Sequence, residues 1–533
     1  MSRRSIRFLL GLCLLAGRAG AQAGHSEHAP TEAGTPRLGT INFPTSAPAA
    51  AQAEFQLGVL YLHSFEYLSA ERAFRRAEGL APNFALAYWG EAMTYTHPVW
   101  NEQDLSSARG ALERLGPTPE ARRAKAPSAR EQAWLGAIEA LYGEGTKPQR
   151  DTLYARAMEQ LVRQFPEDHE AKAFYALSLL GLNQGVRDTL TYLRAAAYAD
   201  TVFRANPDHP GAAHYLIHAY DDPLHAPQGL AAARAYARIA PDAAHAQHMT
   251  THIFLAMGMW DDVVAQNRIA VGLTAPVPGH YTSWLAYGLI QQGKYDAAHS
   301  FIEELQRSLN SEGQRAQHSA LAEARAHWLL HAEDWNSPIS RWRLDRSRMS
   351  GSGRLVDIFA DGVIAYRRRD ATRLGEVGDS LTAQLQTLQR DGELTGSLGL
   401  AARIMARELG AMQLFLGGAR EAAVRSLREA GALEDAMPMD FGPPVLVEPS
   451  HELLGNMLLE MDPSEAVRQF QRALVLAPGR SRALLGLARG AVATGDKATA
   501  RRAIDQLLGN WHAADPRVRD AIAPLRRLVD RMP

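Results

Sequence analysis

The chain has 533 residues, of which 46% are hydrophobic and 22% are charged, and its formal net charge is −1 at pH 7. A chain of this length exceeds what one compact core usually supports, so we expect several domains or a repeat array. Its near-zero charge, with acidic and basic residues interspersed, excludes the basic surface that nucleic acid requires, so nucleic acid is not an expected partner.

The first residues have the features of a secretory signal. Basic residues between positions 3 and 7 precede an apolar run at 8–15, and a small-residue cleavage site ends at Ala23. We therefore expect residues 1–23 to be a cleaved signal peptide and the protein to be periplasmic or secreted. Residues 24–50 are rich in Ala, Pro, Ser, Thr and Gly without an apolar period, which predicts a flexible leader.

The rest of the sequence is expected to lack membrane spans and thiols. No later segment approaches the roughly 20 apolar residues that a transmembrane helix needs. The only cysteine, Cys13, lies inside the expected signal. Any metal site in the mature chain must therefore use histidine, carboxylate or carbonyl ligands instead of thiolate.

A repeat of about 34 residues, the length of a tetratricopeptide (TPR) unit, begins at Ala51. Ala, Leu, Arg, Glu and Gln dominate the composition, which favours helix over sheet. Gly58 and Ala70 are small enough for two paired helices to approach closely, and Phe74 would fill the space between them. The fold class predicted is all-α, a right-handed TPR-type solenoid of about ten to thirteen helix pairs ending in a capping helix. Seven residues of the first unit match the TPR pattern: Leu57, Gly58, Tyr61, Ala70, Phe74, Ala77 and Pro82.

The array is expected to have two parts. Residues 51–336 form an N-terminal TPR array that carries the histidine cluster, and residues 337–353 form a longer connection. Residues 354–533 form a C-terminal TPR array with the capping helix. A second long connection at 437–449 contains the segment Phe441-Gly442-Pro443-Pro444.

Histidines gather in one part of the chain. Seven of the 19 lie between positions 209 and 252. His214 and His248 are one repeat of 34 residues apart, and so are His218 and His252. Side chains three or four residues apart share a helix face, so adjacent repeats each present a stripe of imidazoles. With the next repeat, six imidazoles are expected to face one concave hollow: His214, His218, His245, His248, His252 and His280.

These six histidines predict a transition-metal site. Neutral imidazole is the commonest metal ligand, and three or four imidazoles with an open position suit a divalent ion such as zinc or copper. Two other interpretations stay open: the same histidines could recognise an organic or peptide ligand, or they could serve the structure alone. If a metal is bound, protonation of the imidazoles below roughly pH 6.5 is expected to release it.

Other residues are weaker candidates. Glu91, His97, His209 and Tyr287 are candidate groove residues, although packing explains the first two equally well. Among the C-terminal carboxylates, Glu452 is the first to test. The sequence contains no phosphate-binding loop, nucleophile elbow or His-Glu-x-x-His motif, so catalytic residues stay unassigned and enzymatic activity stays open.

Two further sets of polar residues have simpler explanations. Asp221 and its neighbour follow the first histidine stripe and can accept backbone donors in a turn. Glu323, His327 and His331 lie at helical spacing, and a solvated helix face explains them as well as a site does.

Two segments resemble a family of exported bacterial TPR proteins of uncharacterised function. They are HPGAAHYLIHAYD at 209–221 and HAQHMTTHIF at 245–254. The segment Phe441-Gly442-Pro443-Pro444 is also similar, and the resemblance extends over about residues 51–490. The family often has proline where Thr250 stands. The resemblance implies the fold and export, and it supplies no activity.

Two functions are therefore expected. The first is an exported TPR protein that binds a transition metal through histidines on its concave face, either handling the ion or using it as a metal-dependent enzyme. The alternative is a non-enzymatic TPR scaffold that holds a peptide or partner protein in the groove. The expected groove partner is a metal ion or small ligand in the first case, and a peptide or protein in the second.

Overall fold

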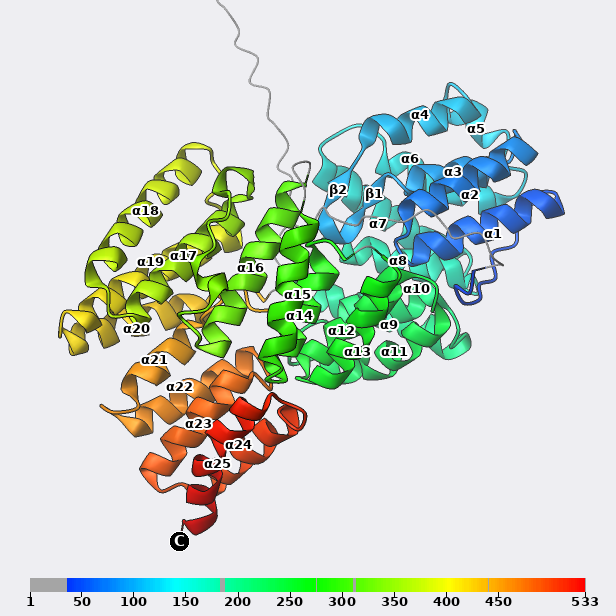
Figure 1. The fold of residues 1–533 in the computed structure, drawn as a ribbon. Coiled ribbons are helices and arrows are strands. Elements are labelled where there is room, and N and C mark those ends of the chain that lie inside the picture. Colours follow the sequence, from blue (N-terminus) through cyan, green and yellow to red (C-terminus); the bar gives the residue numbers. More distant parts are fainter. Residues whose placement is uncertain (1–35, 183–186, 275, 310–312, 440, 533) are drawn as a thin grey trace, which may run out of the picture.

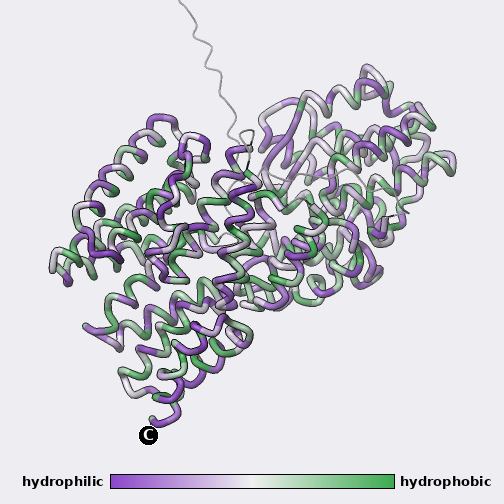
Figure 2. Tube along the Cα trace, in the orientation of Figure 1, coloured by the Kyte–Doolittle hydropathy of each residue, from purple (hydrophilic) through white to green (hydrophobic). Residues whose placement is uncertain are grey.

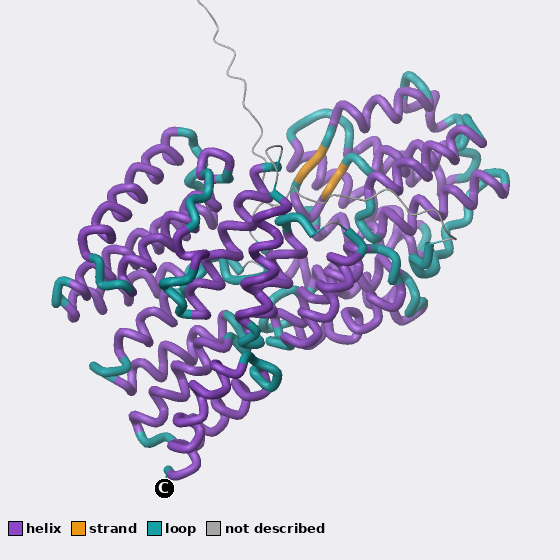
Figure 3. The backbone as a smooth tube through the Cα atoms, in the orientation of Figure 1, coloured by secondary structure: helices purple, strands orange, loops and turns teal. Residues whose placement is uncertain are grey.

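The computed structural model describes residues 36–182, 187–274, 276–309, 313–439 and 441–532. Within these residues the chain forms 25 α-helices and two short strands (Figures 1 and 3). Consecutive helices pack as pairs, and the pairs stack one after another. The protein is an all-α solenoid of the TPR type, as the sequence predicts.

The first part of the solenoid also contains a short hairpin that the sequence did not predict. Strands β1 (Thr96–His97) and β2 (Glu102–Gln103) pair antiparallel around the 3-10 turn η1 (Pro98–Trp100). The helices of this part are α1 (Ala49–His63), α2 (Tyr67–Leu80), α3 (Ala85–Met93), α4 (Leu105–Leu115), α5 (Pro119–Arg123), α6 (Ala129–Leu141), α7 (Lys147–Gln164), α8 (His169–Leu180), α9 (Thr189–Ala205), α10 (Pro210–Ala219), α11 (Ala226–Ile239), α12 (Ala244–Ala256) and α13 (Trp260–Gly272).

The second part continues the stack. Two 3-10 turns, η2 (Pro338–Arg341) and η3 (Arg346–Arg348), precede α17, within the connection expected at 337–353. The helices are α14 (His280–Gln291), α15 (Tyr295–Ser308), α16 (Arg315–Ala332), α17 (Gly351–Arg367), α18 (Ala371–Arg390), α19 (Gly396–Leu416), α20 (Arg420–Asp435), α21 (Ser450–Leu458), α22 (Pro463–Leu476), α23 (Ser481–Thr494), α24 (Lys497–Asn510) and the last helix α25 (Pro516–Arg531).

Glycines allow the helices to pair and turn. Gly58 of α1 lies so close to the ring of Phe74 in α2 that an added Cβ atom would be 2.6 Å from it. The turns after α12 and α14 contain Gly258 at φ +69° and Gly293 at φ +66°, in the left-handed region that favours glycine. These are the positions at which the repeat pattern places the turns.

Residues 36–48 pack on the first repeats. Phe43 is fully buried, and the centroid of its ring lies 4.9 Å from that of Trp134. The flexible leader expected at 24–50 is therefore corrected in its second half, because a buried aromatic side chain anchors this segment to the core. The expected signal peptide and the start of the leader fall within residues 1–35, outside the described residues.

The superhelix closes on itself. The indole nitrogen of Trp260 donates to the carbonyl of Gly479 at 2.9 Å, and the hydroxyl of Ser481 donates to the carbonyl of Gln291 at 2.6 Å. Figure 1 shows the C-terminal helices, in orange and red, beside the green helices of the middle of the chain. The interior between these parts is therefore walled by segments about 200 residues apart in the sequence.

Hydrophobic and hydrophilic residues alternate along the helices, as Figure 2 shows. This is the pattern of helices that bury one face against neighbours. Among the described residues, no helix is long and apolar enough to cross a bilayer.

Candidate metal centre

The six predicted ligands lie on the first helices of three successive pairs. Helices α10 and α12 carry five of them, each at most 5% exposed, and the sixth begins α14 and is partly exposed. Their ligand atoms gather in two groups of three, and within each group these atoms lie within 4.8 Å of one another. The reason is geometric: side chains meet across the space between neighbouring first helices, and three helices enclose two such spaces. We call them group A (His214, His218, His245) and group B (His248, His252, His280).

The ring nitrogens of group A have the spacing of ligands around one ion. The Nε2 atom of His214 lies 3.0 Å from Nε2 of His218 and 3.2 Å from Nε2 of His245. Two nitrogens bound to one zinc ion at about 2.0–2.1 Å, with a tetrahedral angle, lie about 3.3 Å apart. Two of the three nitrogen pairs of group A are therefore spaced as in a metal site, and all three ligand atoms lie within 4.8 Å of one another.

Group B has a similar spacing and adjoins group A. The Nε2 atoms of His248 and His252 are 3.2 Å apart, and the ring centroid of His280 lies 4.5 Å from that of His248. Between the groups, the ring centroids of His218 and His252 are 6.1 Å apart, and those of His245 and His248 are 6.5 Å apart. These separations are hardly larger than those within a group, so the two groups are direct neighbours.

A backbone carbonyl fixes the tautomer of His214. Its Nδ1 atom lies 2.7 Å from the carbonyl oxygen of His63, which can only accept. In the neutral ring, Nδ1 therefore carries the proton and Nε2 presents a lone pair to His218 and His245. Burial lowers the pKa of His214 to about 3 and that of His218 well below its ordinary value. Both rings are therefore unprotonated at neutral pH, which is the form that binds metal.

Asn267 of α13 fixes the tautomer of His248. The Nδ1 atom of His248 lies 2.7 Å from the amide oxygen of Asn267. The amide nitrogen of Asn267 donates to the carbonyl of Val263 at 3.1 Å, so the amide oxygen is the atom that faces the imidazole. Nδ1 of His248 is thus the donor, and its Nε2 atom presents a lone pair.

Asp221 fixes the same tautomer in His252. The Nδ1 atom of His252 lies 2.5 Å from the buried carboxylate of Asp221, which accepts its proton in a hydrogen bond. In their neutral forms, His248 and His252 would then turn two lone pairs toward each other across 3.2 Å. A metal ion bound to both nitrogens would remove the repulsion between these lone pairs. A carboxylate behind a ligating histidine is the usual support of a metal ligand.

A third histidine group behaves differently. The carboxylate of Glu170 accepts from Nε2 of His63 at 2.8 Å and from Nε2 of His209 at 3.1 Å. The hydroxyl of Tyr215 faces Nδ1 of His63 at 2.9 Å, and the backbone nitrogen of Ala212 donates to Nδ1 of His209 at 3.1 Å. Every ring nitrogen thus faces a complementary partner, so hydrogen bonding alone accounts for this group. The candidate groove residue His209 is the N-cap of α10.

Aromatic rings surround both groups. The ring centroid of Phe65 lies 4.3 Å from that of His214, and Phe65 has φ 55°, an uncommon conformation for a residue other than glycine. The ring centroids of Trp284 and Phe441 lie 4.4 Å and 5.2 Å from that of His252. This apolar surround excludes water and strengthens the electrostatic interactions of any ion held there.

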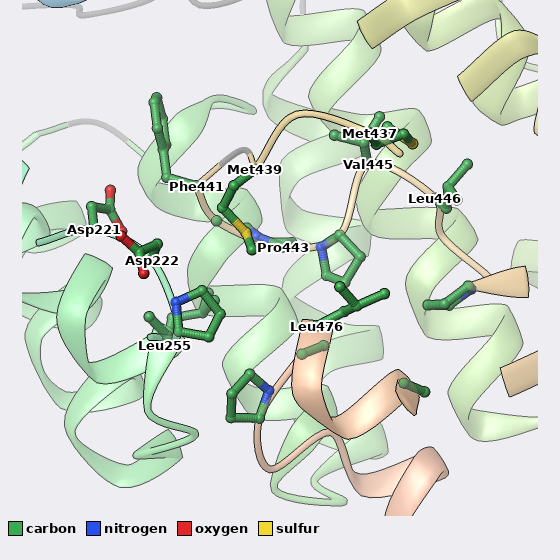
Figure 4. Close-up of a pocket in the computed structure, with 18 of the residues that line it drawn as sticks. Asp221, Asp222, Leu255, Met437, Met439, Phe441, Pro443, Val445, Leu446 and Leu476 are labelled. Atoms are coloured by element: carbon green, nitrogen blue, oxygen red, sulfur yellow. The ribbon is translucent and has the colours of Figure 1, made fainter. Parts of the chain in front are cut away.

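Three cavities among the described residues adjoin this region. One of about 200 Å³ is bordered by His218 and Asp221, and one of about 280 Å³ by His280. Figure 4 shows the third, of about 130 Å³, with Asp221 at one side and the loop that joins α20 to α21 crossing it. This loop, the connection expected at 437–449, contributes Phe441 to all three cavities.

Two candidate groove residues lie outside the histidine groups. Glu91 is buried and pairs with the guanidinium groups of Arg75, at 3.0 Å, and Arg114. His97 stacks on Tyr67, with ring centroids 4.0 Å apart. Glu91 is therefore part of an ion-pair network between the early helices, and His97 packs in the β1–β2 region.

Tyr287 and Glu452 belong to another buried polar cluster. Arg480 donates to the hydroxyl of Tyr287 at 3.1 Å and to the carboxylate of Glu452 at 2.7 Å. Arg482 contacts the other oxygen of Glu452 at 2.9 Å. Burial acts to raise the pKa of Glu452, but the two guanidinium groups outweigh it and hold this pKa below its usual range. Glu452 is therefore an ion-pair partner that links distant parts of the solenoid.

Sequence reasoning missed the residues that support the imidazoles from behind. His63, Phe65 and Asn267 lie in other repeats or on second helices, where no spacing rule connects them to the histidine stripes. The sequence explains Asp221 as a turn residue, although its place three residues after His218 is a signal that it can reach the histidine stripes.

Comparisons with known proteins concern the fold alone. The sequence matches no protein-family model and no curated protein. Similar solved structures include the human IFIT1 dimer with m7Gppp-AAAA, 12% identical with TM-score 0.35, covering 88% of this chain and 90% of that chain. Yeast Tom70 is 12% identical with TM-score 0.27, covering 90% and 95%. At these values the likeness supports no argument about function. The class, a TPR solenoid, is defined by the chain's own helix pairs and turns.

Proposed function

We propose that this protein is a metal-binding TPR solenoid that holds two transition-metal ions, zinc or copper, one in each histidine group. The observation that carries the proposal is the distance of 3.2 Å between the Nε2 atoms of His248 and His252. The Nδ1 atom of each ring already donates a hydrogen bond, so in the neutral rings both Nε2 atoms present a lone pair. A cation between them removes the repulsion of two lone pairs. Group A supports a second ion by its equivalent spacing.

The donor set suggests what such ions would do. Three imidazoles per ion leave a coordination position open, as in catalytic zinc sites, and imidazole suits zinc and copper. Because the two groups are direct neighbours, the two ions would lie close together. An open, paired site of this kind serves either metal handling or metal-dependent hydrolytic or redox chemistry.

The direct test is elemental analysis of the purified mature protein, followed by titration of the metal-free form with zinc and with copper(I) or copper(II). We expect two tightly bound ions per chain. Metal well below one ion per chain after full titration would contradict the proposal. Capture of one partner protein by a metal-free, chelator-treated chain would instead favour the scaffold function.

Metal binding at group A is expected to resist mild acid. A solvent-exposed site of three histidines with ordinary pKa values near 6.5 would bind about a thousandfold more weakly at pH 5.5 than at pH 7. Because burial lowers the pKa of His214 to about 3, and lowers that of His218 well below its ordinary value, protons do not compete for these two rings. We therefore expect a loss of at most about tenfold, in contrast to the release below pH 6.5 that the sequence predicted.

This is measured by zinc competition with a chromophoric chelator at pH 7 and pH 5.5, in a His248→Ala variant with only group A intact. The lowered pKa of His214 protects metal binding against acid, but it makes the metal-free fold less stable in acid. The unfolded chain takes up a proton at His214 near pH 6.5 and the folded chain only near pH 3. Between these values, falling pH should lower the free energy of unfolding by about 1.4 kcal/mol per pH unit for this ring. A thousandfold weakening of zinc binding at pH 5.5 would contradict the burial of the site.

We also propose that the protein is exported to the periplasm or secreted, because residues 1–23 have the pattern of a cleaved signal. The mature chain would contain no cysteine, since Cys13 is removed with the signal. Intact-mass spectrometry tests this: a mature chain that still contains residues 1–23 would contradict it.

A further inference from the structure

A pair of polar side chains lies beside group B, at a place that the metal proposal does not use. Glu323 and His327 are four residues apart on α16, so they share one face of this helix. Both line the cavity of about 280 Å³ that His280 borders. The cavity thus joins a metal-ligand candidate on α14 to two titratable groups on α16.

Neither side chain has its polar atoms fully satisfied by the described residues. Glu323 is partly buried, and its side-chain carboxyl group makes no hydrogen bond or ion pair with the described residues. Burial alone raises its pKa to about 7. His327 is 5% exposed, and its Nδ1 atom has no hydrogen-bond partner. Burial lowers the pKa of His327 to about 3, so this ring is neutral at physiological pH. Buried polar atoms are normally paired, so a cavity next to two such groups points to a partner from outside the chain.

The remaining walls define the chemistry of that partner. Leu355, Leu398 and Met405 give the cavity an apolar part, and its lining also includes Trp284, Phe441 and the group B residue His280. No lysine or arginine lines it within the described part of the chain, so in the metal-free protein an anion would find no cationic side chain to pair with. An ammonium group would lie close to the ion proposed for group B and be repelled by it.

We propose that this cavity binds a small uncharged organic molecule with a hydroxyl group, which hydrogen-bonds to Glu323 and His327 while its apolar body packs on the opposite wall. The inference depends on the proposed metal centre only for the exclusion of an amine. The bound molecule would be the substrate of that centre, because His280 belongs to group B and also lines the cavity. The mixture of an apolar wall and a few convergent polar groups is typical of small-molecule sites.

Three matched probes test the proposal: benzyl alcohol, benzoate and benzylamine share one ring and differ in the charge of the head group. Their binding is measured by ligand-observed NMR at pH 6, on the metal-free and the zinc-loaded full chain. We expect benzyl alcohol to bind at least about tenfold more tightly than benzoate to the metal-free chain, and at least about tenfold more tightly than benzylamine to the zinc-loaded chain. Glu323→Leu should weaken benzyl alcohol by about tenfold, whereas Glu323→Gln, which keeps the hydrogen-bonding shape, should stay within about threefold.

Two controls separate binding from folding. Glu323→Leu removes an unpaired carboxyl group, so its melting temperature is expected to equal or exceed that of the wild type. His327→Phe provides a second variant, which keeps an aromatic ring at this position but removes its nitrogen atoms. Glu304→Gln, on the exposed face of α15, should leave probe binding unchanged. Equal binding of benzoate and benzyl alcohol to the metal-free chain, wild-type affinity in both Glu323→Leu and His327→Phe, or no binding of benzyl alcohol to either form would overturn the proposal. Probe binding to a chain that takes up no metal would retain the pocket and reject the metal centre alone.

Discussion

Replacing His248 with alanine is expected to reduce the metal content from two ions per chain to one, and replacing His214 is expected to remove the other ion. Each histidine is central to one group: His214 contacts both other rings of group A, and His248 contacts both other rings of group B. Elemental analysis after dialysis against a weak chelator measures the result. The double variant should bind no tightly held ion.

The affinity that each variant loses is expected to be large. Changing a residue that only supports a metal ligand typically weakens binding by about 10–100-fold. Removing a ligand itself should therefore cost at least about a hundredfold at the affected group. Asp221→Asn, which keeps the shape of the residue behind His252 but removes its charge, should fall in the smaller range and act on group B alone.

A matched control tests whether the loss of metal is specific to the histidines of groups A and B. His169 begins α8, away from both groups, and His169→Ala should leave two ions per chain. Unchanged metal content in both His214→Ala and His248→Ala would reject the site. Loss of both ions in each single variant would instead mean that the two groups bind metal only as one unit.

The fold was predictable because its signals are local and repeated. Gly58 and Phe74 meet because two helices of one repeat must pack closely, and that requirement recurs at the repeat period. The same period placed His214 and His248 at equivalent positions of neighbouring helices, which the structure bears out. The period could not predict that the ligand atoms divide into two adjacent groups, since that depends on how the first helices are spaced around the superhelix.

The support of the site was not predictable, because it comes from distant parts of the chain. Phe65 reaches group A through a turn about 150 residues earlier in the sequence, in a conformation that no sequence pattern marks. Phe441 reaches His252 from the connection between α20 and α21. Both contacts exist only because the superhelix curls back on itself, and helical periodicity carries no information about that curvature.

Two side chains for which the sequence offers a solvated helix face as an explanation line a cavity in the structure. Glu323 and His327 fit a solvated helix face by spacing alone, yet both line a partly open cavity between helices. A 3.6-residue period shows which side chains share a face, but not whether that face meets solvent or an enclosed space. Only the closure of the solenoid distinguishes the two.

That closure depends on a buried arginine, and Arg480→Met is expected to lower the free energy of unfolding by about 3–5 kcal/mol. Arg480 is fully buried between repeats, where it pairs with Glu452 at 2.7 Å and donates to the hydroxyl of Tyr287 and to the carbonyl of Val447. Methionine fills a similar volume but leaves Glu452 with only Arg482 as its charged partner. Chemical denaturation followed by circular dichroism measures the change.

A surface pair provides the comparison for this variant. Arg428 makes two hydrogen bonds with Glu465 at 3.0 and 2.6 Å, yet its side chain is 50% exposed, so Arg428→Met should cost no more than about 1 kcal/mol. Adding Glu452→Gln to Arg480→Met should recover part of the loss, because it removes the carboxylate left with one partner. Equal costs for the buried and the exposed arginine would mean that the Arg480 cluster does not hold these distant segments of the solenoid together. Because Val447 belongs to the loop that lines all three cavities, Arg480→Met should also make that loop exchange its amide hydrogens faster.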